Sequence, residues 1–276
     1  MVTPVTVVGF FVYPVKSARG IPQARVRVAP TGFEWDRQWM LVDERGTFLS
    51  QRSHPKLARI VPEINAEALV LTAPGMPALQ VPLGHRGEPV PVRVWKAACT
   101  GLDQGREAHE WVSRVLGESV RLVRVAQDPA RIANPEFAGA TPAPLAFPDG
   151  YPFLVCNQAS LEDLNQRLPQ GISMERFRPN IVVTGLPAWA EDRIDTLAIG
   201  ALTLRLVKPC TRCSIPSLDP TTGERSTDPT PVLRTFRFDR KLRGVTFGEN
   251  AVIVQGVGCE IERGAPCQVT GRHLRQ

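Results

Sequence analysis

The chain has 276 residues, a formal net charge of +6 and 43% hydrophobic residues. This length allows one large domain or two of ordinary size, and the composition excludes a disordered chain. The arginines are scattered among carboxylates without a basic run or an aromatic ladder. We therefore expect a solvated surface and no nucleic-acid binding.

The first sixteen residues, MVTPVTVVGFFVYPVK, are apolar, but this run is short and ends near Pro14. It lacks the charged region that precedes the apolar part of a signal peptide, so we expect a buried β-strand and no membrane segment. Six cysteines are spread through the chain without a sign of export. This use of cysteine predicts free thiols and a cytoplasmic location.

Short runs rich in Val, Leu and aromatic residues dominate the first hundred residues, and turn residues such as DERG at 43–46 separate them. This pattern predicts an all-β unit, either a barrel or a sandwich. Helical spacing predicts a helix over 106–116. A stretch rich in Pro, Gly and Ala follows at 127–150 and forms a linker or a long loop.

A strand at 151–157 and a helix at 158–168, with Ser160 as its N-cap, open the second unit. Two further β segments are predicted at 176–185 and 197–210, and the tail alternates apolar and polar residues around Gly. The predicted fold is β-rich α+β, with an N-terminal β-barrel-like domain followed by a second β-rich domain with a few helices. The predicted division is 1–126, a connecting segment at 127–150, and 151–276.

The segment KPCTRCSIPSLDPTTGE, residues 208–224, holds a cysteine pair that three chemistries could use: a disulfide redox couple, a zinc site or a thiolate ligand for another metal. Two prolines behind the pair prevent the helix of a thioredoxin-type site. A structural zinc needs four ligands, and neither Cys259 with Cys267 nor the histidines give a usual spacing. Inert core thiols would not need the cations Lys208 and Arg212 beside them.

Nearby cations favour the thiolate form of cysteine, which is a strong ligand for transition metals. An organic cofactor that brings its own sulfurs could supply the other metal ligands, and Arg, Lys or Ser side chains would bind its phosphate. Candidate residues for this role are Lys16 with Ser17, Arg37, and Arg178 with Asn180. Each of these residues taken alone also has an ordinary structural explanation.

Together, these segments resemble the MOSC family, the molybdenum cofactor sulfurase C-terminal domain proteins. The resembling branch has an additional N-terminal β-barrel domain and includes the amidoxime-reducing components. YPVKSARGI and FEWDRQWMLVDERGTFLSQ resemble the N-terminal domain, whereas ASLEDLNQRL, ERFRPNIVV, KPCTRCSIPSLDPTTGE and FGENAVIVQGVG resemble the MOSC domain. The resemblance covers nearly the whole chain, and CxRC followed by DPxTG is a specific signature. It implies that the second domain is a MOSC β-barrel domain with a few helices.

The resemblance implies a molybdenum cofactor (Mo-molybdopterin) held between the two domains. Cys213 would be the metal ligand and the catalytic residue, with Cys210 as a neighbour of unassigned role. The residues expected to hold the pterin and its phosphate come from both domains: Lys16, Ser17, Arg37, Arg178, Asn180, Thr211 and Arg212. Ser160 is a further candidate contact.

The implied reaction is the two-electron reduction of N-hydroxylated small molecules: amidoximes, hydroxylamines and N-hydroxylated bases. Cys259 and Cys267 do not have the spacing of an iron–sulfur cluster. A separate electron donor is therefore expected, either a ferredoxin, a flavodoxin or a cytochrome b5-like protein. Two alternatives remain open: a cofactor carrier or sulfur-transfer protein without reductase turnover, and a non-catalytic β-barrel module without metal.

Overall fold

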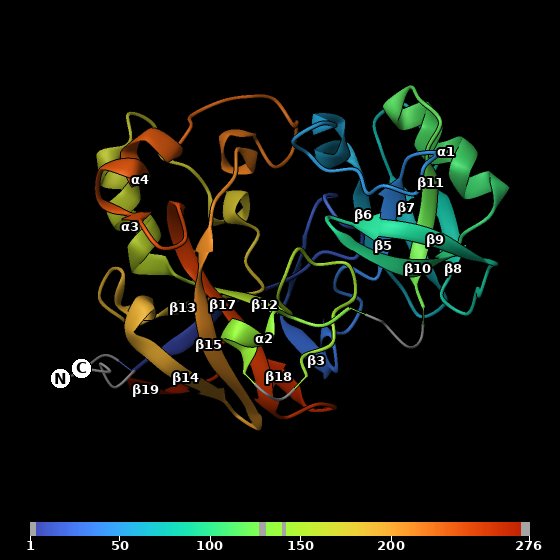
Figure 1. Cartoon of the computed structure of the whole chain (residues 1–276). Coiled ribbons are helices and arrows are strands. Elements are labelled where there is room, and N and C mark those ends of the chain that lie inside the picture. Colours follow the sequence, from blue (N-terminus) through green and yellow to red (C-terminus); the bar gives the residue numbers. More distant parts are fainter. Residues whose placement is uncertain (1–3, 127–130, 140–141, 272–276) are drawn as a thin grey trace.

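The structure, a computed structural model, describes residues 4–126, 131–139 and 142–271. Two β-rich lobes lie side by side, and the described residues include four α-helices (Figure 1). The first lobe contains β5 to β11 and α1, whereas the second contains β1 to β4, β12 to β19, α3 and α4. The chain is therefore β-rich with few helices, as the sequence predicts.

Two antiparallel sheets and helix α1 (Arg106–Leu116) build the first lobe. One sheet has the order β5-β11-β10-β9, and its strands are β5 (Trp39–Val42), β9 (Pro89–Val94), β10 (Ala97–Asp103) and β11 (Arg121–Val125). The other contains β6 (Val61–Ile64), β7 (Ala68–Thr72) and β8 (Leu79–Pro82). The prediction of a helix at 106–116 is confirmed, because Trp111 and Leu116 are buried in the core of this lobe.

A nine-stranded sheet dominates the second lobe and runs in the order β19-β14-β15-β17-β12-β13-β1-β2, with β16 beside β17. Its strands are β1 (Thr6–Val12), β2 (Ile21–Gln23), β12 (Phe153–Asn157), β13 (Ile181–Thr184), β14 (Ile194–Ile199), β15 (Leu202–Thr211), β16 (Phe238–Asp239), β17 (Gly244–Gln255) and β19 (Cys267–Gly271). A smaller sheet joins β18 (Glu260–Glu262), β3 (Arg25–Ala29) and β4 (Gly32–Phe33). Three further α-helices are α2 (Pro135–Ala138), α3 (Gln158–Arg167) and α4 (Thr230–Phe236).

Strand β1 lies in the second lobe, although it comes from the start of the chain. It pairs with β13, from Thr6 opposite Thr184 to Phe10 opposite Ile181. A bridge between Thr6 and Pro266 brings the two ends of the sheet together without a complete ladder, so the sheet is not a closed barrel. The division at 126 and 150 remains a proposal about segments of sequence, because the hydrogen-bonded sheets do not divide there.

One local prediction in the second lobe needs correction. The side chain of Asn157 caps α3 by accepting a hydrogen bond from Ala159 N at 3.3 Å, so the prediction of Ser160 as the N-cap is wrong. Ser160 is fully buried and donates to Glu191 at 2.8 Å. The strand predicted in 176–185, entered through Arg-Pro-Asn, is confirmed as β13 from Ile181, and a 3₁₀ helix (Met174–Phe177) precedes it.

Other 3₁₀ helices are Pro55–Arg59, Ala190–Arg193 and Ile215–Ser217. The segment 127–150 contains α2, while its residues 127–130 and 140–141 lie outside the described part. No helix in the described ranges combines the length and apolar character that crossing a bilayer requires.

Candidate functional site

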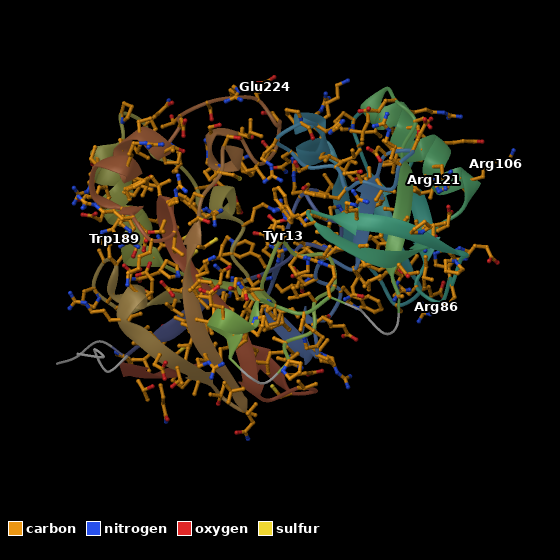
Figure 2. The ribbon with its side chains drawn as sticks, in the orientation of Figure 1. Tyr13, Arg86, Arg106, Arg121, Trp189 and Glu224 are labelled. Atoms are coloured by element: carbon orange, nitrogen blue, oxygen red, sulfur yellow. The ribbon has the colours of Figure 1, made fainter. Side chains whose placement is uncertain are left out.

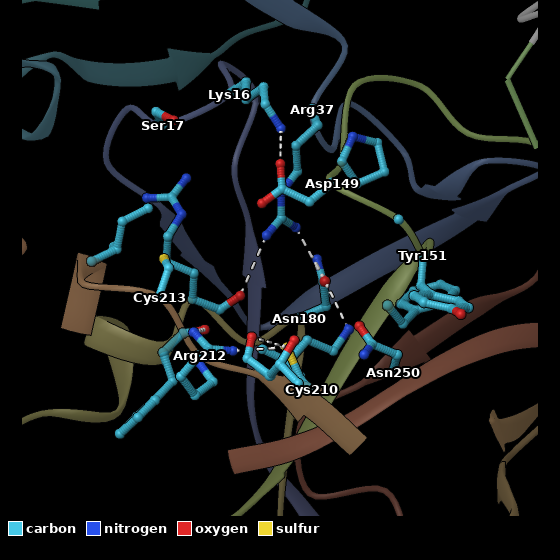
Figure 3. Close-up of a pocket in the computed structure, with 18 residues that line it drawn as sticks. Lys16, Ser17, Arg37, Asp149, Tyr151, Asn180, Cys210, Arg212, Cys213 and Asn250 are labelled. Carbon is cyan, nitrogen blue, oxygen red and sulfur yellow. Dashed lines mark hydrogen bonds and ion pairs between the residues drawn. The ribbon is translucent and has the colours of Figure 1, made fainter. Parts of the chain in front are cut away.

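A cavity lies where the two lobes meet, and it contains about 780 Å³ of empty space, part of it open to solvent. The eight residues that the resemblance assigns to the metal and the pterin all line this cavity (Figure 3): Lys16, Ser17, Arg37, Arg178, Asn180, Thr211, Arg212 and Cys213. Figure 3 shows Lys16 and Ser17 on one side and Cys210 and Arg212 on the other. The structure brings these residues together, and what each one binds remains a prediction.

Two turns from the N-terminal segment form one wall of the cavity. They lie side by side because Lys16 N donates to Trp39 O and Arg37 N donates to Tyr13 O, both at 2.8 Å. The Lys16 ammonium is buried and donates to Phe147 O at 2.9 Å and to Asp149 Oδ1 at 2.5 Å. Burial lowers the pKa of Lys16, although the Asp149 carboxylate opposes this shift. Burial would also raise the pKa of Asp149, but Lys16 outweighs it and holds that pKa below its usual range.

Arg37 is fixed by a buried carboxylate and a buried amide. Its guanidinium contacts Asp36 at 2.6 Å and donates to Asn180 Oδ1 at 3.1 Å. Asn180 also accepts from Leu154 N at 3.2 Å and donates to Phe11 O at 3.2 Å. Asn180 therefore holds Arg37 against the central strands of the second lobe. Burial raises the pKa of Asp36 even though the charge of Arg37 acts in the opposite direction.

Tyr13 lies between the lobes (Figure 2). The guanidinium groups of two arginines contact its ring. The guanidinium carbons of Arg37 and Arg178 lie 4.3 and 4.2 Å from the ring centroid. Arg178 also donates to Ala18 O at 2.7 Å. Burial, together with the charge of Arg37, lowers the pKa of Arg178 to about 10. This pair of close cations favours an anion in the cavity.

Three of the predicted site residues have left-handed backbone conformations, which side chains other than glycine rarely adopt. The φ angles are 67° at Ser17, 48° at Arg37 and 56° at Arg178. Such conformations cost on the order of 1–2 kcal/mol each and cluster at functional sites. Three of the seven described non-glycine residues with positive φ thus line the cavity.

The cysteine motif begins in the last residues of β15, which ends at Thr211, and continues into the loop after it. Arg212 donates to Cys210 Sγ at 3.0 Å and to Phe177 O at 2.8 Å. Burial disfavours the charge of Arg212, but the neighbouring thiols, above all Cys210, raise its pKa above the ordinary value. Cys213 is exposed and lines the cavity. Both cysteines line the cavity, but they are not equivalent, because Arg212 binds Cys210 whereas Cys213 is the exposed one.

The loop after Cys213 is attached to the N-terminal half of the chain. The residues DPTTG form a turn, in which Asp219 accepts from Thr221 N at 2.8 Å. Hydrogen bonds from Thr221 are the main cause that lowers the pKa of Asp219 to about 2. Thr221 O accepts from Arg19 at 2.7 Å, and a Cβ on Gly223 would lie 2.2 Å from Pro55 O. These contacts position the loop that carries Cys213.

Lys208 and Ser160 do not line the cavity. The expectation that Lys208 supplies charge beside Cys213 is wrong, because its ammonium lies 4.5 Å from the centre of the Phe137 ring. Lys208 lines a neighbouring hollow instead. Strand β15 has register shifts between Leu206 and Lys208 and between Pro209 and Thr211, so simple alternation along the strand fails here.

Sequence reasoning did not identify Asp149, Tyr151 and Asn250, which also line the cavity. Asp149 lies at the end of the proline-rich segment, where composition predicts only a linker. Burial raises the pKa of Tyr151 to about 12, and its hydroxyl is buried without a hydrogen-bond partner among the described residues. Asn250 lies within FGENA, which is part of a segment that resembles the MOSC domain. The resemblance could therefore have identified Asn250, although its residue type alone could not.

The cavity lining carries four cations, Lys16, Arg37, Arg178 and Arg212, against the carboxylate of Asp149. Within the described residues, neither Arg178 nor Arg212 forms an ion pair with a carboxylate. The Nε atom of Arg212 is buried without a hydrogen-bond partner in that same part of the chain. Since such groups need a partner, the cavity fits an anionic ligand with several acceptor oxygens.

All six cysteines are free thiols. Over the ranges that the structure describes, no three His, Cys, Asp or Glu side chains gather in a way that could hold a metal ion.

Comparisons with known proteins agree along nearly the whole chain. The model of the MOSC N-terminal beta barrel domain matches residues 4–119, and the model of the MOSC domain matches residues 142–271. Mitochondrial amidoxime-reducing component 1 of Homo sapiens is 32% identical, across 90% of this chain and 78% of that protein. The Mus musculus protein of the same name is 30% identical, across 97% and 83%. Molybdenum cofactor sulfurase of Bos taurus is 29% identical, across 88% of this chain and 29% of the sulfurase.

Proposed function

Because the chain belongs to the MOSC family, in the group that combines a MOSC N-terminal domain with a MOSC domain, we propose that it binds the molybdenum cofactor and reduces N-hydroxylated compounds. The observation that carries this proposal is the exposed thiol of Cys213 in a cavity rich in unpaired arginine charge. A single thiolate and several phosphate-binding groups are what a metal–pterin cofactor needs from a protein.

The residues around the cavity would each bind a different part of this cofactor or fix its surroundings. Cys213 would be the protein ligand of the metal. Arg178 and Arg212 have no carboxylate partner among the described residues, and they would bind the phosphate. Lys16 and Arg37 are already paired, so they would contribute positive potential and a fixed wall. When bound, the cofactor would supply a two-electron redox couple.

The proposed reaction balances as R–NHOH + 2e⁻ + 2H⁺ → R–NH₂ + H₂O, and its central event is cleavage of the N–O bond. Tyr151 and Asn250 would orient the substrate, since both line the cavity. The Tyr151 hydroxyl is protonated at neutral pH even at the ordinary pKa of about 10, and burial raises its pKa further, to about 12, so it would donate a hydrogen bond to the substrate oxygen. Asp149 keeps Lys16 in place rather than serving as an acid, since its pKa is lowered.

Two features of the proposal concern the surroundings of the protein. Electrons would come from a separate donor protein, either a ferredoxin, a flavodoxin or a cytochrome b5-like protein. Six free thiols suit a reducing compartment, and we propose the cytoplasm.

Two measurements on purified protein test this function: molybdenum content, and reduction of benzamidoxime with reduced methyl viologen as an artificial donor. We expect Cys213→Ala to lower turnover to background, whereas Cys210→Ala, as the matched control, retains both metal and activity. Molybdenum without turnover in the wild type would favour a cofactor carrier. Equal losses in the two variants would instead favour a dithiol or zinc site.

A further inference from the structure

A basic hollow lies beside the cysteine motif, on α4 and the turn between β16 and β17. We define it by its four arginines, Arg212, Arg234, Arg240 and Arg243, and by the ring of Phe238. Its lining contains no carboxylate. Except for Arg212, these side chains belong to exposed residues, and 44% of Phe238 is accessible to solvent.

Positive charge predominates in the segment that forms the hollow. Residues 230–244 carry five cations, Arg234, Arg237, Arg240, Lys241 and Arg243, and the carboxylate of Asp239. Asp239 accepts from Leu242 N at 2.8 Å and thereby shapes the turn. Arg237 is bound to Asp192 at 2.5 Å, whereas no ion pair forms at the other four cations within the described chain. Positive charge is therefore left available to a partner.

Arg212 connects this hollow to the cofactor cavity, because it lines both. Its guanidinium binds Cys210 Sγ at 3.0 Å, and Cys213 follows as the next residue in the chain. A redox protein seated in the hollow would thus lie one side chain away from the cysteine motif. Electron transfer needs this proximity, because its rate falls steeply with distance.

We propose that the basic hollow is the docking site for an acidic electron-transfer protein, which delivers the two electrons of the reaction. This inference rests on the proposed function and adds the place of electron entry and the charge of the partner. Exposed arginines around an exposed aromatic ring are typical of a protein interface, and complementary charge speeds the encounter of two proteins. The hollow lacks the long basic stripe and aromatic ladder that nucleic acid requires.

Reversing the charge of two arginines tests whether the hollow is the docking site. In Arg240→Glu/Arg243→Glu, we expect kcat/KM for a reduced plant-type [2Fe–2S] ferredoxin, an acidic protein, to fall about tenfold or more at low ionic strength. Turnover with reduced methyl viologen should remain unchanged, because this small donor needs no docking surface. Salt should slow the wild type with ferredoxin and have little effect on the variant.

The matched control is Arg106→Glu/Arg121→Glu, which changes the net charge equally on the first lobe, far from α4 (Figures 1 and 2). Both arginines are exposed. We expect its rate with ferredoxin to stay within about threefold of the wild type. Equal losses in both double variants would show that only net charge matters and would overturn the docking site, as would an unchanged rate in the hollow variant.

Binding of oxidised ferredoxin, measured by calorimetry at low salt, separates this inference from the proposed function. If the wild type binds ferredoxin and the hollow variant does not, the docking site stands even without turnover of benzamidoxime. If ferredoxin binds both equally, the docking site is refuted even when turnover with methyl viologen is high. Loss of binding to anionic lipid vesicles in the hollow variant, with unchanged ferredoxin binding, would also refute it.

Discussion

Replacing Arg37 with methionine tests whether this residue stabilises the folded protein in addition to its proposed role at the cofactor site. Methionine keeps most of the apolar stem that packs toward the Tyr13 ring and removes the charge. The side chains of Arg37 and Asp36 are 12% and 1% exposed, so the variant leaves a buried carboxylate without its cation. Asp36 would keep its hydrogen bonds from Tyr13 N, at 2.9 Å, and from the Asn180 side chain.

Breaking a buried ion pair by removing one partner costs about 3–5 kcal/mol, because the other charge stays buried. A chain of this size loses roughly 2–4 °C of melting temperature per kcal/mol, so the melting temperature of Arg37→Met should fall by roughly 6–20 °C. The double variant Asp36→Asn/Arg37→Met removes both charges. The double variant should recover at least half of the lost melting temperature, because it leaves no buried charge without its partner.

The assay is calorimetric unfolding of protein purified without cofactor, so that lost cofactor binding does not contribute. Asp36→Asn alone completes the double-mutant cycle. If Arg37→Met melts with the wild type, Arg37 contributes nothing to the fold and the argument from burial fails. It also fails if the double variant melts no higher than Arg37→Met.

Two further predictions concern stability. Burial raises the pKa of Glu191 above its ordinary value of about 4.5, so the buried carboxylate destabilises the folded protein once the pH rises above that value. The stability that Glu191→Gln gains relative to the wild type should therefore increase as the pH rises above about 4.5, and a difference independent of pH would contradict this. Gly223→Ala should lower the melting temperature more than the matched control Gly75→Ala. Both glycines have φ of 75°, but a new Cβ would meet Pro55 O only at Gly223, so equal losses would show that this contact is unimportant.

The fold class and the two long helices follow from local patterns. Helix α1 begins and ends where its apolar spacing predicts, because Trp111 and Leu116 are both buried in one core. The pairing of β1 with β13 could not be read in this way. The sequence of β1 shows only that it is a buried strand, and it holds no information about which distant strand supplies its hydrogen bonds.

The site was more predictable than the topology because its residues lie in short motifs with recognisable chemistry. Arg178, Asn180 and Cys213 were identified in this way, and each lines the cavity. Asp149 was not identified, because a proline-rich composition predicts a linker or a long loop. Such a composition does not show that the segment forms part of the cavity wall. Lys208 was misplaced because the bulges in β15 change the direction of its side chains, and bulges leave no dependable mark in a sequence.

The position of β1 also bears on how the protein is made. Strand β1 pairs with β2 along one edge and with β13 along the other, and it forms a bridge to Pro266. A nascent chain that has not reached Ile181 can pair β1 with β2 but leaves the other edge of β1 without β13, which invites wrong pairing with other chains. We expect productive synthesis to depend on chaperones that shield this strand until the sheet is complete.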